Sequence, residues 1–274
     1  MPLSDQFRTA LVTGAASGLG AAFVAMLRSE GVEVWGTSRT RDRVPDSTGF
    51  HGLVLELAEP ASIEAAWGEA ERASGGIDLL VNNAGAGVFA PFAAMSDAEW
   101  DGQMRILLHG PAMLARRAWR AMHARGRGCI VNVTSLAAEF PIPYLCAYDA
   151  AKAGLAACTA GLALEGAGSP VRVIDFRPGD YRTNFNNAMR AAPPGGEGAA
   201  DAVAARVWRR LEGLLHDAPE PARAAADLRT ALRRGCRGVV RSGSFFQARL
   251  APFLQRFASQ GMSGRVQRRY FDLS

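Results

Sequence analysis

The sequence predicts an α/β protein with a doubly wound parallel sheet and helices on both of its faces. Short apolar runs alternate with longer segments of helical period, and a glycine-rich turn lies between the first apolar run and the first helical segment. Runs this short and this apolar are typical of parallel strands that are covered on both sides. The 274 residues, 49% hydrophobic and 21% charged, are expected to form one domain over residues 1–274.

Six strands are expected, each followed by a segment of helical period. The strands are predicted at Ala10–Thr13, Val32–Gly36, Leu53–Leu57, Ile77–Val81, Cys129–Val133 and Val171–Phe176. The helices are predicted at residues 18–30, 60–74, 97–124, 146–166, 200–216 and 222–234. Ser96 and Asp97 ahead of Glu99 predict an N-terminal cap for the third helix. Strand-helix alternation implies right-handed crossovers, which place helices on both faces.

Approximately residues 184–274 are expected to form a substrate flap and a C-terminal helical extension. Pro193-Pro194-Gly195-Gly196 interrupts any regular element between residues 184 and 200, which is typical of a flap. Further on, the i, i+3, i+4, i+7 spacing of Leu250, Phe253, Leu254 and Phe257 predicts an amphipathic helix. Two interpretations stay open for it: the helix packs on the sheet edge, or it forms a lid over a bulky apolar substrate.

The net charge of +5 comes from the C-terminal part of the chain. Residues 223–274 contain eleven arginines against two aspartates, Asp227 and Asp272. Such an asymmetry could favour an acidic partner, a carrier-bound substrate or an anionic membrane surface, although solvated helix faces are the simpler interpretation. Nucleic acid is not expected as a partner, because the chain shows no helix-turn-helix pattern and no aromatic stacking platform.

Cysteine usage and the N-terminus predict a cytoplasmic protein. The four cysteines form no Cys-x-x-Cys pair and are interpreted as buried thiols in a reducing compartment, and no histidine has metal-ligand spacing. Residues 1–8 lack the sections of a signal peptide. The longest uncharged helical stretch, Ala153–Leu164, is well short of the roughly 20 residues of a membrane span.

A glycine-rich turn follows the first predicted strand. It reads Thr13-Gly14-Ala15-Ala16-Ser17-Gly18-Leu19-Gly20, and an alanine-rich helix begins within it. Without side chains the backbone can approach a pyrophosphate closely, while the free N–H groups and the positive end of the helix face the anion. The turn therefore predicts a dinucleotide phosphate site.

The end of the second strand bears on which cofactor binds. In dinucleotide-binding folds an acid at this place binds the ribose 2′-hydroxyl, whereas an arginine accommodates a 2′-phosphate. Here Ser38 and Arg39 occupy the place, and Asp42 is the nearest following carboxylate. Arg39 can bind a phosphate through two hydrogen bonds, so NADP(H) is favoured over NAD(H). Alternatively Arg39 stacks on the adenine, which would leave both cofactors acceptable.

Three residues near the fifth strand suit proton transfer. Ser135 follows that strand, and Tyr148 and Lys152 lie one helical turn apart on a common helix face. Lys152 is the only lysine among 31 basic residues, which suggests a position where arginine would fail. An adjacent ammonium stabilises phenolate, so we expect Lys152 to lower the pKa of Tyr148 into the range of general acid-base catalysis.

Together these motifs resemble the short-chain dehydrogenase/reductase family over about residues 8 to 185. The resemblance rests on the glycine turn, on Asn82-Asn83-Ala84-Gly85 after the fourth strand, on Ser135 with Tyr148-x-x-x-Lys152, and on Pro178-Gly179 with Thr183 after the sixth strand. It implies a Rossmann-like sheet. It also implies a homodimer or homotetramer that pairs through the helices at residues 97–124 and 146–166.

The resemblance assigns roles to individual residues. Tyr148 would be the proton donor, Ser135 would polarise the carbonyl, and Lys152 would also hydrogen-bond the nicotinamide ribose. Pro178 to Thr183, with Gly179, would fix the carboxamide. The remaining cofactor-binding residues would be Gly14, Ser17, Gly18, Leu19, Gly20, Ser38, Arg39, Glu56, Leu57, Asn83, Ala84 and Gly85.

Two positions depart from the family pattern. The family usually has an asparagine three residues before the glycine of its fourth helix, where it anchors a proton-relay water; matching Gly110 puts Leu107 there. Glu56 stands where the third strand usually ends in aspartate. Either the proton reaches Tyr148 by another route, or turnover is slowed, or the chemistry differs.

The sequence therefore predicts an NADP(H)-dependent oxidoreductase that interconverts a carbonyl and a secondary alcohol on a small-molecule substrate. The substrate is expected to be hydrophobic or biosynthetic, and bulky or carrier-bound. Because of Leu107, two alternatives stay open: a non-redox reaction such as dehydration or isomerisation on the same scaffold, or a weakly active cofactor-binding regulator.

Overall fold

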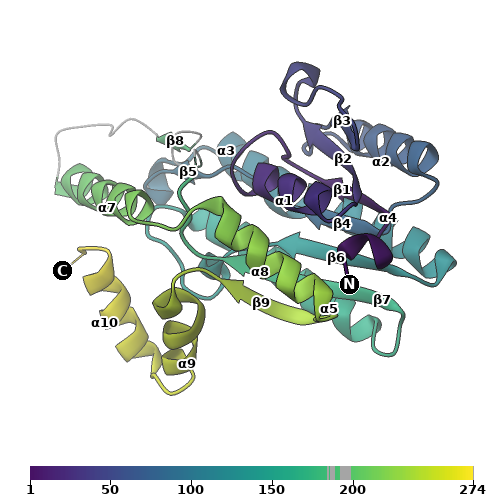
Figure 1. Ribbon diagram of the computed structural model, residues 1–274. Coiled ribbons are helices and arrows are strands. Elements are labelled where there is room, and N and C mark those ends of the chain that lie inside the picture. The colour runs from purple at the N-terminus through teal and green to yellow at the C-terminus, as the bar shows by residue number, and fades with distance from the viewer. Residues whose placement is uncertain (184, 186–188, 192–198, 274) are drawn as a thin grey trace.

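The computed structural model describes residues 1–183, 185, 189–191 and 199–273. Within them the chain forms a seven-stranded parallel sheet in the order β3-β2-β1-β4-β6-β7-β9 (Figure 1). The strands are β1 (Thr9–Val12), β2 (Glu33–Ser38), β3 (Phe50–Val54), β4 (Leu79–Asn82), β6 (Gly128–Val133), β7 (Val171–Pro178) and β9 (Gly238–Ser242). The predicted doubly wound α/β fold is confirmed.

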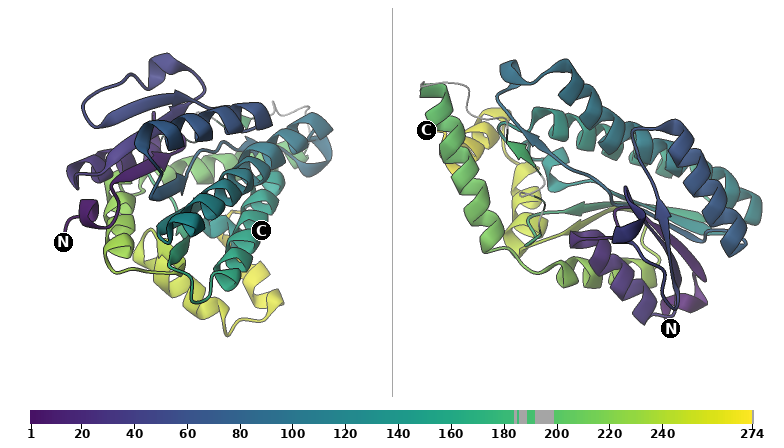
Figure 2. Two further views of the ribbon diagram at one scale, coloured as in Figure 1. Left: turned by 90° about the vertical axis from the view of Figure 1, so that its right-hand side faces the viewer. Right: turned by 90° about the horizontal axis from the view of Figure 1, so that it is seen from above.

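Helices cover both faces of this sheet (Figure 2). One face carries α1 (Gly18–Ser29) and α8 (Pro221–Arg233), which pack against each other. The opposite face carries α2 (Pro60–Ser74), α4 (Gly110–Arg125) and α5 (Cys146–Glu165). The sheet is therefore the middle layer of three.

Strand β1 shows why both faces are dry. Ala10 and Val12 belong to the apolar cluster under α1 and α8, whereas Leu11 between them belongs to the cluster under α2 and α4. Successive strand residues point to opposite faces, so a strand buried on both sides is apolar at every position. All four residues of β1 are buried, as the sequence pattern predicts.

Two strands differ from the sequence-based expectation. The third was predicted at Leu53–Leu57 but ends at Val54. Leu55 and Leu57 are nevertheless buried, and Leu55 N–H still donates to the Ser38 carbonyl, so the apolar run extends beyond the strand. Strand β9 was not expected, because only two of its five residues, Val239 and Val240, are apolar; the others are glycine, arginine and serine. It pairs with β7 from Gly238 opposite Ile174 onward.

The helix predicted over residues 97–124 is interrupted. The chain forms α3 (Asp97–Met104), then a π-helical turn (Arg105–His109), then α4. The predicted cap is present, since Ser96 and Glu99 form a reciprocal capping box. Gly110, which follows the π-helical turn and begins α4, lies so close to the Leu57 carbonyl that a Cβ there would stand 2.6 Å from the oxygen.

The C-terminal part contains α7 (Ala199–His216), α8 and β9, followed by a π-helical turn (Phe246–Leu250), α9 (Ala251–Gln255) and α10 (Gln260–Tyr270). The expected amphipathic face is not buried, because Leu250, Phe253, Leu254 and Phe257 are 37% to 75% exposed. The π-helical turn nevertheless contacts the edge strand β9. The π-helical turn and the early end of α9 break the regular face that the spacing predicts.

Part of the expected flap lies outside the described residues, namely 184, 186–188 and 192–198. Its described part includes β8 (Arg190–Ala191), which pairs with β5 (Val88–Phe89). The interpretation of the cysteines as buried thiols holds for Cys129 but is wrong for Cys146 and Cys158, which are exposed. Within the described residues, no helix combines the length and apolar character that crossing a bilayer requires.

Candidate active site

The carboxyl ends of the parallel strands bring the predicted site residues to one edge of the sheet. Gly14 follows β1, Asn83 follows β4, Ser135 follows β6, and Pro178 ends β7. Strands β1, β4, β6 and β7 are consecutive neighbours in the sheet, so these loops are adjacent. In doubly wound sheets ligands bind in the crevice at this edge.

The glycine turn has the backbone of a phosphate cradle. Gly14 and Gly18 have φ of +68° and +53°, a region that other residues rarely adopt. A Cβ on Gly20 would stand 2.0 Å from the Gly14 carbonyl oxygen, so only glycine allows this close approach. Ser17 caps α1 with extended backbone, and its hydroxyl forms no capping hydrogen bond. The turn therefore presents the N-terminus of α1 without side chains in the way, which fits a dinucleotide pyrophosphate.

Thr13 ties this turn to the loop after β4. Its Oγ1 accepts the N–H groups of Asn83 and Ala84, both at 2.9 Å. Asn83 Nδ2 in turn donates to the Thr13 carbonyl at 2.9 Å. The sequence analysis did not assign Thr13 a role. A buried threonine that directly precedes a glycine turn is a weak signal, and only the fold shows what it holds.

The loop after β7 crosses over the glycine turn. Thr183 faces Gly18, where a Cβ would lie 3.4 Å from the threonine Cβ. Gly179 likewise leaves room for Gln247, whose Oε1 would stand 2.6 Å from a Cβ at that glycine. Gly18 and Thr183, which are 165 residues apart in the sequence, are thus brought to one place.

The predicted adenine end lies at the ends of β2 and β3. Ser38 is buried at the end of β2, and Arg39 after it is exposed. Within the described residues no ion pair occupies the Arg39 guanidinium. Glu56 Oε1 accepts the N–H of Ala58 at 3.2 Å, and Leu57 beside it is buried. The Arg39 guanidinium is therefore available to bind an anion. The Glu56 carboxylate already accepts a hydrogen bond within its own loop.

Helix α5 places Tyr148 and Lys152 side by side. Both are buried, with 9% and 4% exposure, and the Lys152 Nζ lies 5.7 Å from the centre of the Tyr148 ring. Nζ donates to the carbonyl of Val133 at the end of β6 at 2.8 Å. Ser135 follows two residues later and hydrogen-bonds the Tyr148 side chain. The three residues that the sequence singles out thus lie together.

Lys152 was expected to lower the pKa of the Tyr148 phenol, but in the structure this pKa is raised. Burial raises the pKa of Tyr148 to about 12, the hydrogen bond to Ser135 opposes that rise, and the carboxyls of Asp149 and Asp180 add to it. Burial also lowers the pKa of Lys152 to about 8, against the attraction of Asp175. The sequence analysis counted the nearby charge and left out desolvation, which disfavours both charged forms.

Leu107 lies in the π-helical turn and is fully buried. A Cβ on Gly85 would stand 2.8 Å from its Cδ2 and 3.9 Å from the Lys152 Nζ. The leucine therefore fills space next to the lysine with methyl groups. Other apolar side chains border Tyr148 in the same cluster, and the Phe185 ring lies 5.7 Å from the tyrosine ring.

Two carboxylates near Tyr148 were missed by the sequence analysis. Asp180 directly follows Pro178-Gly179, and its carboxylate accepts a hydrogen bond from Gln247 Nε2. Burial raises the pKa of Asp180. Asp149 follows Tyr148, accepts the N–H of Ile142 at 2.8 Å, and has its pKa raised by burial to about 7. An acid directly after a Pro-Gly at a strand end is a usable signal, whereas nothing local connects Gln247 to it.

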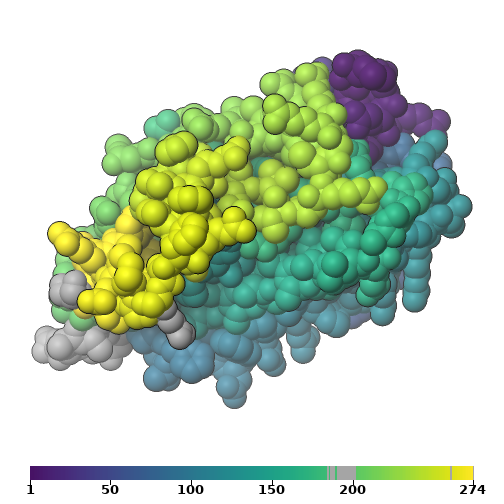
Figure 3. Space-filling view, turned by 90° about the horizontal axis from the view of Figure 1, so that it is seen from below, coloured from purple at the N-terminus to yellow at the C-terminus, as the bar shows by residue number. Residues whose placement is uncertain are grey.

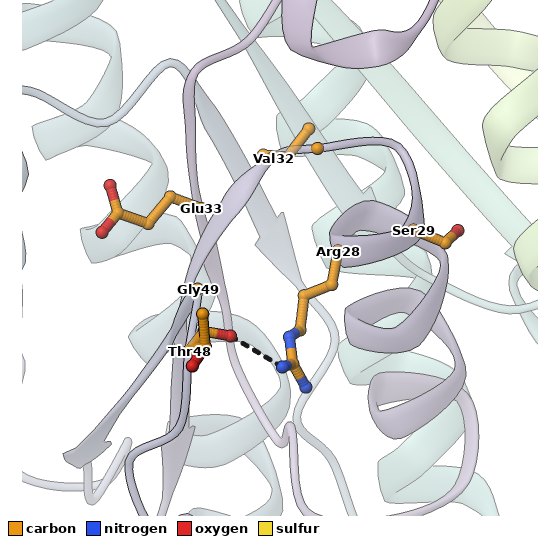
Figure 4. Close-up of a pocket in the computed structure, with 7 residues that line it drawn as sticks. Arg28, Ser29, Val32, Glu33, Thr48 and Gly49 are labelled. Atoms are coloured by element: carbon orange, nitrogen blue, oxygen red, sulfur yellow. Dashed lines mark hydrogen bonds between the residues drawn. The ribbon is translucent and has the colours of Figure 1, made fainter.

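A separate surface hollow lies at the opposite edge of the sheet (Figure 4). Arg28 and Ser29 at the end of α1, Val32 and Glu33 at the start of β2, and Thr48-Gly49 line it. Arg28 donates to the Thr48 carbonyl at 2.8 Å there. No predicted catalytic residue reaches this hollow. Within the described residues, His, Cys, Asp and Glu form no group of three that could hold a metal ion.

The fold and the residues at the carboxyl edge define a dinucleotide-binding oxidoreductase scaffold. The chain belongs to the short-chain dehydrogenase/reductase family, because the sequence pattern of the family described as short chain dehydrogenase matches residues 8–194. It is an enzyme of that oxidoreductase family.

Known relatives have different substrates in their names. The chain is 32% identical to D-threitol dehydrogenase of Mycolicibacterium smegmatis over 196 residues, 69% of this chain and 75% of the relative. It is also 32% identical to 3-oxoacyl-(acyl-carrier-protein) reductase of Escherichia coli over 187 residues, 66% of this chain and 77% of the relative. Among solved structures, a short-chain dehydrogenase from Streptomyces avermitilis aligns with a TM-score of 0.80 and 28% identity, covering 93% of this chain and 94% of that one.

Proposed function

We propose that this protein is an NADP(H)-dependent oxidoreductase that interconverts a carbonyl and a secondary alcohol. The observation that carries the proposal is the juxtaposition of Tyr148, Lys152 and Ser135 at the same edge of the sheet as the glycine turn. A bound NADP(H) would supply or accept the hydride. The chain's own groups would supply binding, orientation and the proton.

The described residues fit such a cofactor. Gly14 and Gly18 give the turn the backbone of a phosphate cradle, Gly20 lets α1 begin against the Gly14 carbonyl, and Asn83 with Gly85 would lie near the adenosine ribose. Arg39 and Ser38 support NADP(H), because a guanidinium can pair with a 2′-phosphate. Solved relatives of the same fold include one complexed with NADH and one with 5-hydroxy-NADP, so fold alone does not choose between the cofactors.

Proton transfer would run between Tyr148 and the substrate oxygen. In the reducing direction the phenol donates its proton to the carbonyl oxygen, and Ser135 donates a second hydrogen bond that polarises the carbonyl. A pKa of about 12 keeps the Tyr148 phenol protonated at neutral pH, which suits a general acid. Lys152 holds its ammonium against the Val133 carbonyl, close to the phenolate that forms.

The proposed substrate is hydrophobic, and either bulky or carrier-bound. Phe185 contacts Tyr148, and the surrounding cluster includes Phe89, Leu145 and Val207. These walls favour an apolar substituent next to the reacting carbonyl. We further propose a homodimer or homotetramer, with α4 and α5 as the pairing helices.

One observation favours a second candidate. Leu107 fills the space beside Lys152 where the family usually binds a relay water, so resupply of the Tyr148 proton from solvent would be slow. The alternative is a reaction without net oxidation, such as dehydration or isomerisation, or a weakly active cofactor-binding regulator.

The test is NADPH consumption by the purified chain against a panel of small and bulky apolar ketones, with the product identified by mass. Alcohol formed in amounts equal to the NADPH consumed supports the proposed function. A product of altered mass or isomeric form without NADPH consumption would favour the non-redox alternative. Tight NADPH binding without any product would favour the regulator.

A further inference from the structure

The segment Phe245–Val266 exposes an unusual number of large apolar side chains. Eight are more than one third exposed: Phe245, Phe246, Leu250, Phe253, Leu254, Phe257, Met262 and Val266, at 73%, 47%, 37%, 56%, 52%, 75%, 51% and 64%. The described residues outside this segment contain five others, and these are scattered from Met1 to Val239. In Figure 3 the yellow C-terminal residues form a raised region at one end of the face shown. Large exposed apolar patches mark interaction sites.

This segment, continued to Arg269, also carries unpaired positive charge. Between Asp227 and Asp272 the sequence has no acidic residue. Two arginines that precede this segment have partners, since Arg233 in α8 pairs with Glu30 and Arg241 in β9 pairs with Glu139. By contrast, those of the last helices are exposed and form no ion pair within the described part of the chain: Arg249, Arg256, Arg265, Arg268 and Arg269.

Exposed rings interleaved with unpaired guanidinium groups fit one partner chemistry best. An anionic lipid surface accepts protruding apolar side chains without a complementary shape, and it supplies the negative charge that the arginines lack. A second copy of this chain would bring five unpaired arginines against another five, which disfavours self-association. We propose that the segment from Phe245 to Arg269, the docking surface, binds the surface of an anionic membrane.

The docking surface is connected to the catalytic edge. Gln247, within its π-helical turn, bonds the Asp180 carboxylate, and the Asp180 N–H donates to Gln247 Oε1 at 3.3 Å. Gln255 in α9 donates to the Glu139 carbonyl at 3.2 Å, near the loop that begins at Ser135. Docking would thus hold the substrate side of the site against the lipid. This last point rests on the proposed function and implies an apolar ketone that partitions into membranes.

The experiment is co-sedimentation of the full chain with phosphatidylcholine vesicles and with vesicles that also contain phosphatidylglycerol. We expect binding to the anionic vesicles, weakened by salt. Each arginine near an anionic surface contributes about fivefold to the partition coefficient, so Arg265→Gln with Arg268→Gln and Arg269→Gln should lower it about a hundredfold. Phe253→Ser with Phe257→Ser should lower it by a similar amount, because two buried rings are lost.

Matched controls separate this surface from general charge and hydrophobicity. Phe92→Ser removes a ring that is 65% exposed, and Arg43→Gln with Arg72→Gln removes two exposed arginines elsewhere; both variants should sediment like the wild type. Thermal unfolding checks that every variant is folded. No binding of the wild type to anionic vesicles would overturn the proposal, as would an equal loss in the controls. A dimer that the Phe253 and Phe257 variant dissociates, without vesicle binding, would show self-association instead. Vesicle binding requires no turnover, so its outcome is independent of the proposed activity.

Discussion

The side chain of Leu107 and the ammonium of Lys152 both border Gly85. A Cβ on Gly85 would stand 2.8 Å from Leu107 Cδ2 and 3.9 Å from Lys152 Nζ, and Leu107 is fully buried. The methyl groups of Leu107 thus occupy space through which Lys152 would exchange protons with solvent. The Lys152 ammonium instead donates to the Val133 carbonyl.

Leu107→Asn is expected to raise the rate of carbonyl reduction by up to about tenfold, because a polar side chain beside Lys152 could hold a relay water. The buried amide should lower the free energy of unfolding by roughly 1–3 kcal/mol. Steady-state kinetics and thermal unfolding measure the two effects. Leu107→Met, which keeps volume without adding a polar group, is the control. An unchanged rate in a folded Leu107→Asn protein would mean that the relay is bypassed here.

The Tyr148 phenol should stay protonated well into the alkaline range. With a pKa of about 12, it would be about 1% ionised at pH 10, where an ordinary tyrosine is half ionised. Near-ultraviolet absorbance of the cofactor-free wild type minus that of Tyr148→Phe measures this ionisation directly. A difference titration centred at or below pH 10 would show that Lys152 outweighs burial, as the sequence alone suggested.

Asp149 should make the fold less stable as the pH rises. Its pKa is about 7 in the folded protein against 3.8 normally, so the folded chain binds the proton more tightly. Its contribution is therefore largest below pH 4 and is lost as the pH rises to 7, by about 4 kcal/mol at most. Asp149→Asn keeps an acceptor for the Ile142 N–H and should raise the melting temperature at pH 8 more than at pH 5.

The control for Asp149 is Asp101→Asn, which neutralises an exposed carboxylate. It should change the melting temperature equally little at both pH values. Equal stabilisation by Asp149→Asn at pH 5 and pH 8 would show that proton binding by Asp149 does not differ between the folded and unfolded states.

Arg39→Ala should weaken NADPH binding about 10- to 100-fold and NADH binding far less, because a charge-assisted contact to the 2′-phosphate is lost. Fluorescence titration with both cofactors measures the two constants. Arg41→Ala removes a neighbouring arginine that pairs with Asp46 and should leave the preference unchanged. Equal weakening of both cofactors by Arg39→Ala would assign Arg39 to adenine stacking.

Six of the seven strands were predictable, because most of their residues are buried on both faces of the sheet. Strands such as β1 and β4 are buried along their whole length and are mostly apolar, and a glycine follows each of them within a few residues. Strand β9 was not predictable, because it is short, sits at the sheet edge and is only partly buried. The spacing of the apolar residues in the C-terminal segment predicted a helix, but spacing does not show whether another part of the protein covers the apolar face of that helix. The exposure of Phe253 and Phe257 could be read only from the fold.

The arrangement of Ser135, Tyr148 and Lys152 followed from motif spacing, since one helix and one strand end place all three. The pKa of the Tyr148 phenol did not, because burial depends on residues distant in sequence. The contact between Asp180 and Gln247 could not be predicted for the same reason, since it joins the loop after β7 to the C-terminal segment. Local sequence patterns therefore predicted which side chains form the site, whereas tertiary packing determines their burial and hence their pKa values.

The central claim is that Tyr148 transfers the proton that accompanies the hydride, and Tyr148→Phe tests it most directly. NADPH binding by fluorescence should remain within about twofold of the wild type, while NADPH-dependent ketone reduction should fall at least about 100-fold. A folded variant that binds NADPH and still reduces the ketone at a wild-type rate would contradict the claim.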